Sequence, residues 1–178
     1  MPPIVPQIIG IIAVILFVLS YQLKKRSGII ICNVISRCLY ILQYILLGAF
    51  SGAILDVLGV FASVIAEKKD KPFIKKHLRT VIIAIDAIMV IAGVVICIIN
   101  NSLLDLLPIA GVLLHTSAFW ISDERKIRLV SLTGSPFWFV YNFASRAYGS
   151  AAGDLFTIVS IIVAMIKYRK IETKKDVQ

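Results

Sequence analysis

Residues 67–100 read EKKDKPFIKKHLRTVIIAIDAIMVIAGVVICIIN, a strongly basic loop followed directly by an apolar run. The run from Val81 to Ile99 is nineteen residues long and carries one charge, Asp86. A helix of about 20 apolar residues is long enough to cross the ~30 Å hydrocarbon layer of a bilayer. The stretch therefore predicts a membrane-spanning helix with six Lys and Arg residues just before it, on one side of the membrane.

The composition of the whole chain agrees with a membrane protein. Of its 178 residues, 59% are hydrophobic and 16% are charged, against about 25% charged in ordinary soluble domains. The net charge of +9 does not indicate nucleic-acid binding, because the basic residues flank apolar runs and form no stripe with interleaved aromatics. Anionic lipid at the basic cytoplasmic loops is the expected partner.

Seven apolar runs sort the basic residues between the two sides of the membrane. Seventeen of the nineteen Lys and Arg residues fall in residues 24–26, 68–79, 125–128 and 167–175, all on one side of a seven-span chain. Because cytoplasmic segments carry the excess of Lys and Arg, we expect the N-terminus outside and the C-terminus in the cytoplasm. The expected helices cover residues 4–22, 28–48, 51–66, 80–99, 103–122, 129–145 and 147–167.

An internal repeat accounts for the odd number of helices. Residues 6–26 match residues 108–128, and residues 37–57 match residues 135–155. Each repeat holds three helices, and the helix at 80–99 returns the chain so that both repeats have the same orientation. Parallel repeats are one of the two repeat classes of transporters, and chance similarity between apolar helices is the alternative. The first repeat, the basic loop with its linker helix, and the second repeat with its basic tail occupy residues 1–66, 67–102 and 103–178.

Polar residues follow one face of two of these helices. The first stripe, at steps of four, three and four residues that keep it on one helical face, is Asn33, Arg37, Tyr40 and Tyr44. The repeat-equivalent stripe is Ser135, Trp138 and Asn142. We expect the two stripes to face each other across a pseudo-two-fold axis.

Charged groups inside the spans are the strongest site candidates. They cost about 3 kcal/mol each on insertion scales and persist where they pair or line a wet cavity. Asp56 and Asp154 are repeat equivalents, whereas Arg37 has no basic counterpart. We expect Arg37 between the two carboxylates, either in a solvated site or as a bridge that fixes helix packing. For His115 two interpretations stay open, a packed neutral imidazole and a cavity-lining group.

Small residues at GxxxG spacing predict close helix packing. Gly48 with Gly52, and Gly149 with Gly153, have this spacing. Such residues let helices approach closely in lipid. We expect them to pack helices within the bundle, with a dimer interface as the alternative.

No catalytic constellation is present in the sequence. There is no Gly-rich phosphate loop and no nucleophile–base signature. Cys32, Cys38 and Cys97 show no metal-binding spacing. We therefore expect no enzyme, no metal site and no cofactor.

Two runs resemble a known family. They are Leu46–Asp56, LLGAFSGAILD, and Tyr141–Asp154, YNFASRAYGSAAGD, together with Leu106-Leu107-Pro108. The chain resembles the YgjV family of bacterial inner-membrane proteins, which is grouped with the SWEET and PQ-loop transporters. The resemblance implies a three–one–three helix plan and a bacterial inner-membrane location. SWEET proteins place an Asn on the third helix of each bundle, and the matching positions here are Asp56 and Asp154.

The sequence thus predicts an all-α membrane protein that carries a small polar or cationic solute by alternating access. We expect a monomer, with a dimer as the alternative. The other interpretation is a receptor or a structural or regulatory membrane protein whose polar core serves helix packing. The candidate substrate-binding residues are Asn33, Arg37, Tyr40, Tyr44, Asp56, His115, Trp138, Asn142 and Asp154.

Overall fold

Every regular element of the described chain is helical. The computed structural model describes residues 4–175, with side chains as far as Lys167. The elements in this range are α1 (Ile4–Ser20), α2 (Arg26–Leu47), α3 (Phe50–Glu67), α4 (Pro72–Lys76), α5 (Leu78–Asn100), η1 (Leu103–Asp105), α6 (Leu106–Phe119), α7 (Glu124–Ala144) and α8 (Tyr148–Lys175).

The lengths and compositions of these helices suit a membrane. In the described residues, α2, α3, α5 and the Tyr148–Lys167 part of α8 are each long and apolar enough to cross one. The ranges Ile4–Ser20 and Leu103–Phe119 form shorter apolar helices. The structure therefore agrees with the predicted all-α membrane class.

Local signals explain the helix ends, including those that the sequence analysis misplaced. Gly48 ends α2 with a φ of 70°, in the left-handed region that favours glycine. Helix α7 begins before the expected residue 129, because Asp123 accepts hydrogen bonds from the backbone N–H groups of Arg125 and Lys126, at 2.8 and 3.2 Å. The short helix α4, which was not predicted, starts at Pro72, a residue suited to a first turn.

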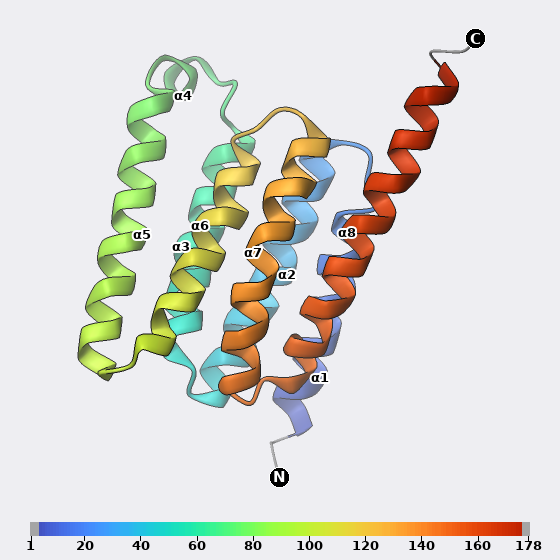
Figure 1. Cartoon of the computed structure of the whole chain (residues 1–178). Helices are drawn as coiled ribbons and strands as arrows, with labels where there is room; N and C mark the ends of the chain where they lie inside the picture. The colour runs from blue at the N-terminus through green and yellow to red at the C-terminus, as the bar shows by residue number, and fades with distance from the viewer. Residues whose placement is uncertain (1–3, 176–178) are drawn as a thin grey trace.

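Six of the helices form a closed ring. Helix α1 packs on α2 and α8, α6 packs on α7 and α3, and the pairs α2–α3 and α7–α8 complete the ring. The set α1–α3 thus contacts the set α6–α8 through two helix pairs, α1 with α8 and α3 with α6. Helix α5 lies at the edge, packed on α3 and α6 (Figure 1). It has 11% of its apolar window buried, so most of its surface faces outward.

The basic segments gather at one end of the bundle. In Figure 1 the loop with α4, the α1–α2 loop, the α6–α7 loop and the C-terminal end of α8 are at the top, and the N-terminal end is at the bottom. The four segments that carry the excess of Lys and Arg thus lie at the same end of the bundle. The tail residues Arg169, Lys170, Lys174 and Lys175 belong to the predicted basic cytoplasmic tail, and their side chains lie outside the described residues.

Two arginines that match each other in the predicted repeat, Arg26 and Arg128, link helices of α1–α3 to helices of α6–α8 at the basic end. The Arg26 guanidinium donates to the carbonyls of Phe119 and Ile121 at the end of α6, at 2.6 and 3.1 Å. Reciprocally, Arg128 donates to the carbonyls of Tyr21 and Leu23 just beyond α1, at 3.1 and 2.9 Å. The last carbonyls of a helix lack intrahelical donors, and cations are favoured there. We call these two arginines and the carbonyls they bind the arginine clamp.

Lys69 adds a third cation to this end. Its Nζ donates to the Trp120 carbonyl at 2.8 Å and to the Ser122 hydroxyl at 2.6 Å. Burial lowers the pKa of the Lys69 amine, and the nearby Arg26 charge lowers it further. The α3–α4 loop is thereby held against the end of α6.

Three of the four GxxxG glycines lie at close contacts inside the bundle. A Cβ at Gly52 would meet the Tyr141 ring, one at Gly153 would overlap the Val14 side chain, and one at Gly149 would touch Gln7. Gly48 has open space around it, so its packing role was wrongly predicted. Its left-handed φ explains that glycine instead.

The contact between α8 and α1 gives a first prediction. We expect Gly153→Leu to destabilise the protein by about 1–3 kcal/mol or more, because overpacking forces side chains and backbone apart. Ala152→Leu, on the exposed side of the same turn, is the matched control and should change stability little. Thermal unfolding of the purified protein in detergent measures both, and equal effects would contradict the packing described here.

Candidate functional site

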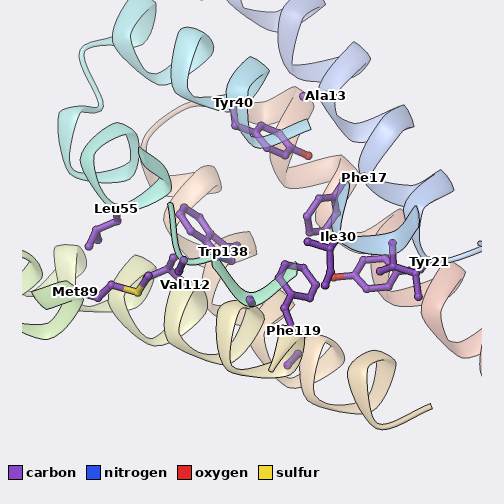
Figure 2. Packing of buried hydrophobic residues seen from close by; sticks show 14 of the residues in the cluster. Ala13, Phe17, Tyr21, Ile30, Tyr40, Leu55, Met89, Val112, Phe119 and Trp138 are labelled. Carbon is purple, nitrogen blue, oxygen red and sulfur yellow. The ribbon is translucent and has the colours of Figure 1, made fainter. Parts of the chain in front are cut away.

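A small central cavity lies inside the ring of helices. Its volume is about 20 Å³, close to the ~10–15 Å³ that one water requires. Figure 2 shows Phe17, Tyr40 and Trp138, from α1, α2 and α7, around this interior. The lining residues are Phe17, Arg37, Tyr40, Tyr44, Asp56, His115, Trp138, Asn142 and Asp154.

The structure brings eight of the nine predicted site residues to this cavity. The ninth, Asn33, is buried one turn from Arg37 and accepts a hydrogen bond from its Nε at 3.0 Å. Phe17 was missed, because an aromatic residue on an apolar helix looks like any lipid-facing side chain. Its match with Phe119 in the repeat was the available signal.

An ion pair closes one side of the cavity. Arg37 Nη1 on α2 and Asp56 Oδ1 on α3 are 2.5 Å apart, and their side chains are 3% and 4% exposed. Gly59, one turn after Asp56, leaves room for the guanidinium, since a Cβ there would press on Arg37. A buried charge is tolerated when it is paired and hydrogen-bonded, and Asn33 with Asp56 provides both.

Asp154 on α8 has a different environment from its repeat partner. Asn142 Nδ2 donates to Asp154 Oδ2 at 2.8 Å, and the Tyr44 hydroxyl donates to Asn142 Oδ1 at 2.6 Å. The chain of hydrogen bonds fixes the Asn142 amide with its N–H side toward the carboxylate. No cation lies within ion-pair distance of Asp154 among the described side chains. The expected triad is therefore wrong, because Arg37 pairs with Asp56 alone in the described chain.

Aromatic rings form a continuous wall along the cavity. Tyr40 stacks on Tyr44 with ring centroids 6.3 Å apart, and Tyr44 stacks on Trp138 at 6.1 Å with an interplanar angle of 13°. Tyr141 meets both Tyr44 and Trp138 edge-on. The two polar stripes thus face each other, and the repeat equivalents Tyr44 and Asn142 contact each other directly.

His115 is both packed and cavity-lining. It is 1% exposed, and its Nδ1 lies 3.2 Å from the Tyr21 hydroxyl. The Phe17 ring lies against it, with centroids 5.6 Å apart. A Cβ at Gly134 would press on the imidazole, so that glycine provides its space. Tyr21 is a further residue that the sequence analysis did not identify.

The formal charges of the cavity leave a negative balance. Counted as formal charges, Arg37 and Asp56 cancel, and Asp154 is the acidic group of the cavity with no cation within ion-pair distance among the described side chains. A cation near aromatic faces and a carboxylate is the ligand that such a surface favours. The described residues contain no group of three side chains that could hold a metal ion. Asp86 lies outside this site, half-buried on α5.

Comparison with known proteins identifies the family. The sequence model of the family described as Imp-YgjV, bacterial inner membrane protein, matches residues 4–174, which is nearly the whole chain. Neither a search of curated proteins nor a search of solved structures gives a match. The inner-membrane location agrees with the apolar helices of the structure. The chain therefore belongs to the YgjV family of bacterial inner membrane proteins.

Proposed function

We propose that this protein transports a small polar or cationic solute across the inner membrane by alternating access. The observation that carries the proposal is Asp154, a buried carboxylate with an amide donor and no cation beside it among the described residues. Unpaired charge inside a membrane is costly and marks solute or ion pathways. The aromatic wall beside it adds cation–π attraction. A cationic group is the solute feature that this site favours most.

The proposal includes a specific membrane arrangement. We assign seven spans, α1, α2, α3, α5, α6, α7 and α8, in the three–one–three plan of SWEET and PQ-loop transporters, with the N-terminus outside. The gathering of basic residues at one end supports this orientation. The reciprocal packing of α1 on α8 and of α6 on α3 supports two related units. Since one chain encloses the cavity, a monomer suffices for this function. Transport also requires no catalytic residue.

The arginine clamp has the position of a cytoplasmic gate. Arg26, the first residue of α2, binds the end of α6, and Arg128, on α7, binds the chain just beyond α1. If the units rock apart at this end, both sets of hydrogen bonds must break together. The equivalence of the two arginines makes the closure symmetric across the unit boundary.

Buried polar atoms without partners support a second, wetter state. Asn33 Nδ2, Ser131 Oγ and Thr157 Oγ1 have no hydrogen-bond partner in the described structure. Each such group costs about 1–3 kcal/mol when buried. Water entering an opened pathway would hydrate these groups and offset part of the cost of separating the helices. The cavity of about 20 Å³ is too small for a metabolite, so we assign the structure to a closed state.

The alternative is a non-transporting membrane protein with a structural polar core. The observation in its favour is the closed Arg37–Asp56 bridge, which joins α2 to α3. The pair satisfies two charges that would otherwise be unstable in lipid. Asp154 distinguishes the two functions, because a neutral acceptor could make the packing contact with Asn142, whereas attraction of a cation requires the carboxylate.

The orientation can be tested by labelling from one side. In a variant with Cys32, Cys38 and Cys97 replaced by serine, Asn101→Cys should react with a membrane-impermeant maleimide added to spheroplasts. Lys71→Cys should react only after permeabilisation, because the basic loops remain inside. The opposite pattern would contradict the proposed orientation.

The role of Asp154 can be tested with pairs of cationic and neutral isosteres. Thermal unfolding is measured with choline against 3,3-dimethylbutan-1-ol, and with guanidinium at low millimolar concentration against urea. We expect stabilisation by one of the cations and not by its neutral partner. Asp154→Asn should abolish it and leave unliganded stability unchanged or higher, because a buried unpaired charge is removed.

Two further variants control this experiment. Asp86→Asn removes a carboxylate from a span away from the cavity and should keep the cation response. Asp56→Asn leaves Arg37 unpaired and should destabilise the protein by about 3–5 kcal/mol. A cation response that survives Asp154→Asn would remove this carboxylate from the proposed site.

The gate role of the clamp can be tested by access to Ser20, a fully buried residue at the end of α1. In the cysteine-free background, Ser20→Cys is labelled with the impermeant maleimide in inverted vesicles. Arg26→Gln with Arg128→Gln should raise the labelling rate at least about tenfold, since each hydrogen bond from a charged group contributes about 1.5–3 kcal/mol. Lys126→Gln is the matched control. Equal rates in folded clamp and control variants would contradict the gate.

A further inference from the structure

A second cavity lies on the outer surface of the bundle, away from the central site. It is a groove between α7 and α8 with a volume of about 290 Å³, against about 20 Å³ for the central cavity. Its walls are Leu132 on α7 and Ile162, Met165 and Ile166 on α8, with Arg125 also lining it. Ile162 and Ile166 are 43% and 52% exposed, so the groove opens to the surroundings of the bundle.

The groove has a polar and an apolar end. Arg125 lies in the first turn of α7, at the basic end of the molecule, and Leu132 lies seven residues deeper. At 1.5 Å per residue this separation is about 10 Å along the helix. Half of the ~30 Å hydrocarbon layer is about 15 Å. The groove therefore runs from the membrane surface into one leaflet, with a guanidinium at its mouth and aliphatic side chains below.

We propose that this groove is a binding site for an anionic phospholipid of the cytoplasmic leaflet. The Arg125 guanidinium would bind the lipid phosphate, for which its planar fork of N–H donors is suited. An acyl chain would lie along Leu132, Ile162 and Met165. Asp123, two residues before Arg125, accepts hydrogen bonds from the backbone N–H groups of Arg125 and Lys126 and thereby fixes the start of α7. The site rests on the proposed orientation of the basic end but not on transport of a solute.

Charge and position favour a lipid over a second copy of the chain. The cytoplasmic leaflet carries anionic headgroups that attract basic residues near its surface. A second copy would bring another Arg125 and the same basic end against this one. An apolar helix face without a cation would not favour an anionic lipid over a second copy of the chain.

The test compares two lipids with identical acyl chains. The full-length protein is purified in detergent and examined by native mass spectrometry after titration with palmitoyl-oleoyl phosphatidylglycerol or the corresponding phosphatidylcholine. We expect one phosphatidylglycerol to be retained with about fivefold preference, the factor that corresponds to ~1 kcal/mol per basic residue at an anionic surface. Arg125→Gln should remove this preference. Lys126→Gln, a neighbouring exposed cation, should keep it.

A second pair of variants tests the apolar part of the groove. Ile162→Trp fills the groove and should reduce retention of both lipids. Val163→Trp places the same side chain at a similarly exposed position, 51% against 43%, outside the groove walls, and should not. Thermal unfolding confirms that each variant is folded. The proposal would be overturned by equal lipid binding of the Arg125→Gln and Lys126→Gln variants, or by full lipid binding of Ile162→Trp. A dimer of the unmodified protein that Ile162→Trp dissociates would also overturn it.

Discussion

The ion pair between Arg37 and Asp56 is the contact on which the centre of this protein depends. Removing either partner would strongly destabilise this part of the bundle, because the remaining buried ion would have lost its water without compensation. The pair joins α2 to α3 at 2.5 Å, and Asn33 holds the remaining side of the guanidinium. Gly59 supplies the space that the guanidinium occupies. Helices α2 and α3 can therefore each contain a charged side chain in the middle of the bundle without exposing it.

The Arg–Asp pair is present in only one of the two predicted repeats. Asp56 and Asp154 are equivalent, yet the position of Arg37 is Ser135 in the second unit. The second carboxylate consequently has Asn142 in place of a cation. One carboxyl group of the interior is thus paired with a cation, and the other is hydrogen-bonded to an amide. At the basic end, Arg26 and Arg128 each bind two backbone carbonyls near the end of another helix.

Much of the central site could be predicted from the sequence, because polar residues are rare in apolar helices and their spacing fixes their face. Arg37, Tyr40 and Tyr44 were placed correctly for this reason. Both carboxylates were predicted as partners of Arg37, and the sequence could not show that only Asp56 pairs with it, since it does not set the distance between α2 and α8. The early start of α7 was missed because a charged segment resembles a loop until the Asp123 cap is considered. Phe17 carries no polar signal at all.

The most direct test of the account is movement of a cation across a sealed bilayer. Purified protein in proteoliposomes is loaded with unlabelled choline, and entry of radiolabelled choline by exchange is followed over time. The account predicts saturable exchange that Asp154→Asn abolishes and Asp86→Asn retains, with guanidinium as the second cation to assay by the same exchange. Specific binding of either cation without exchange in either direction would contradict transport and favour a receptor.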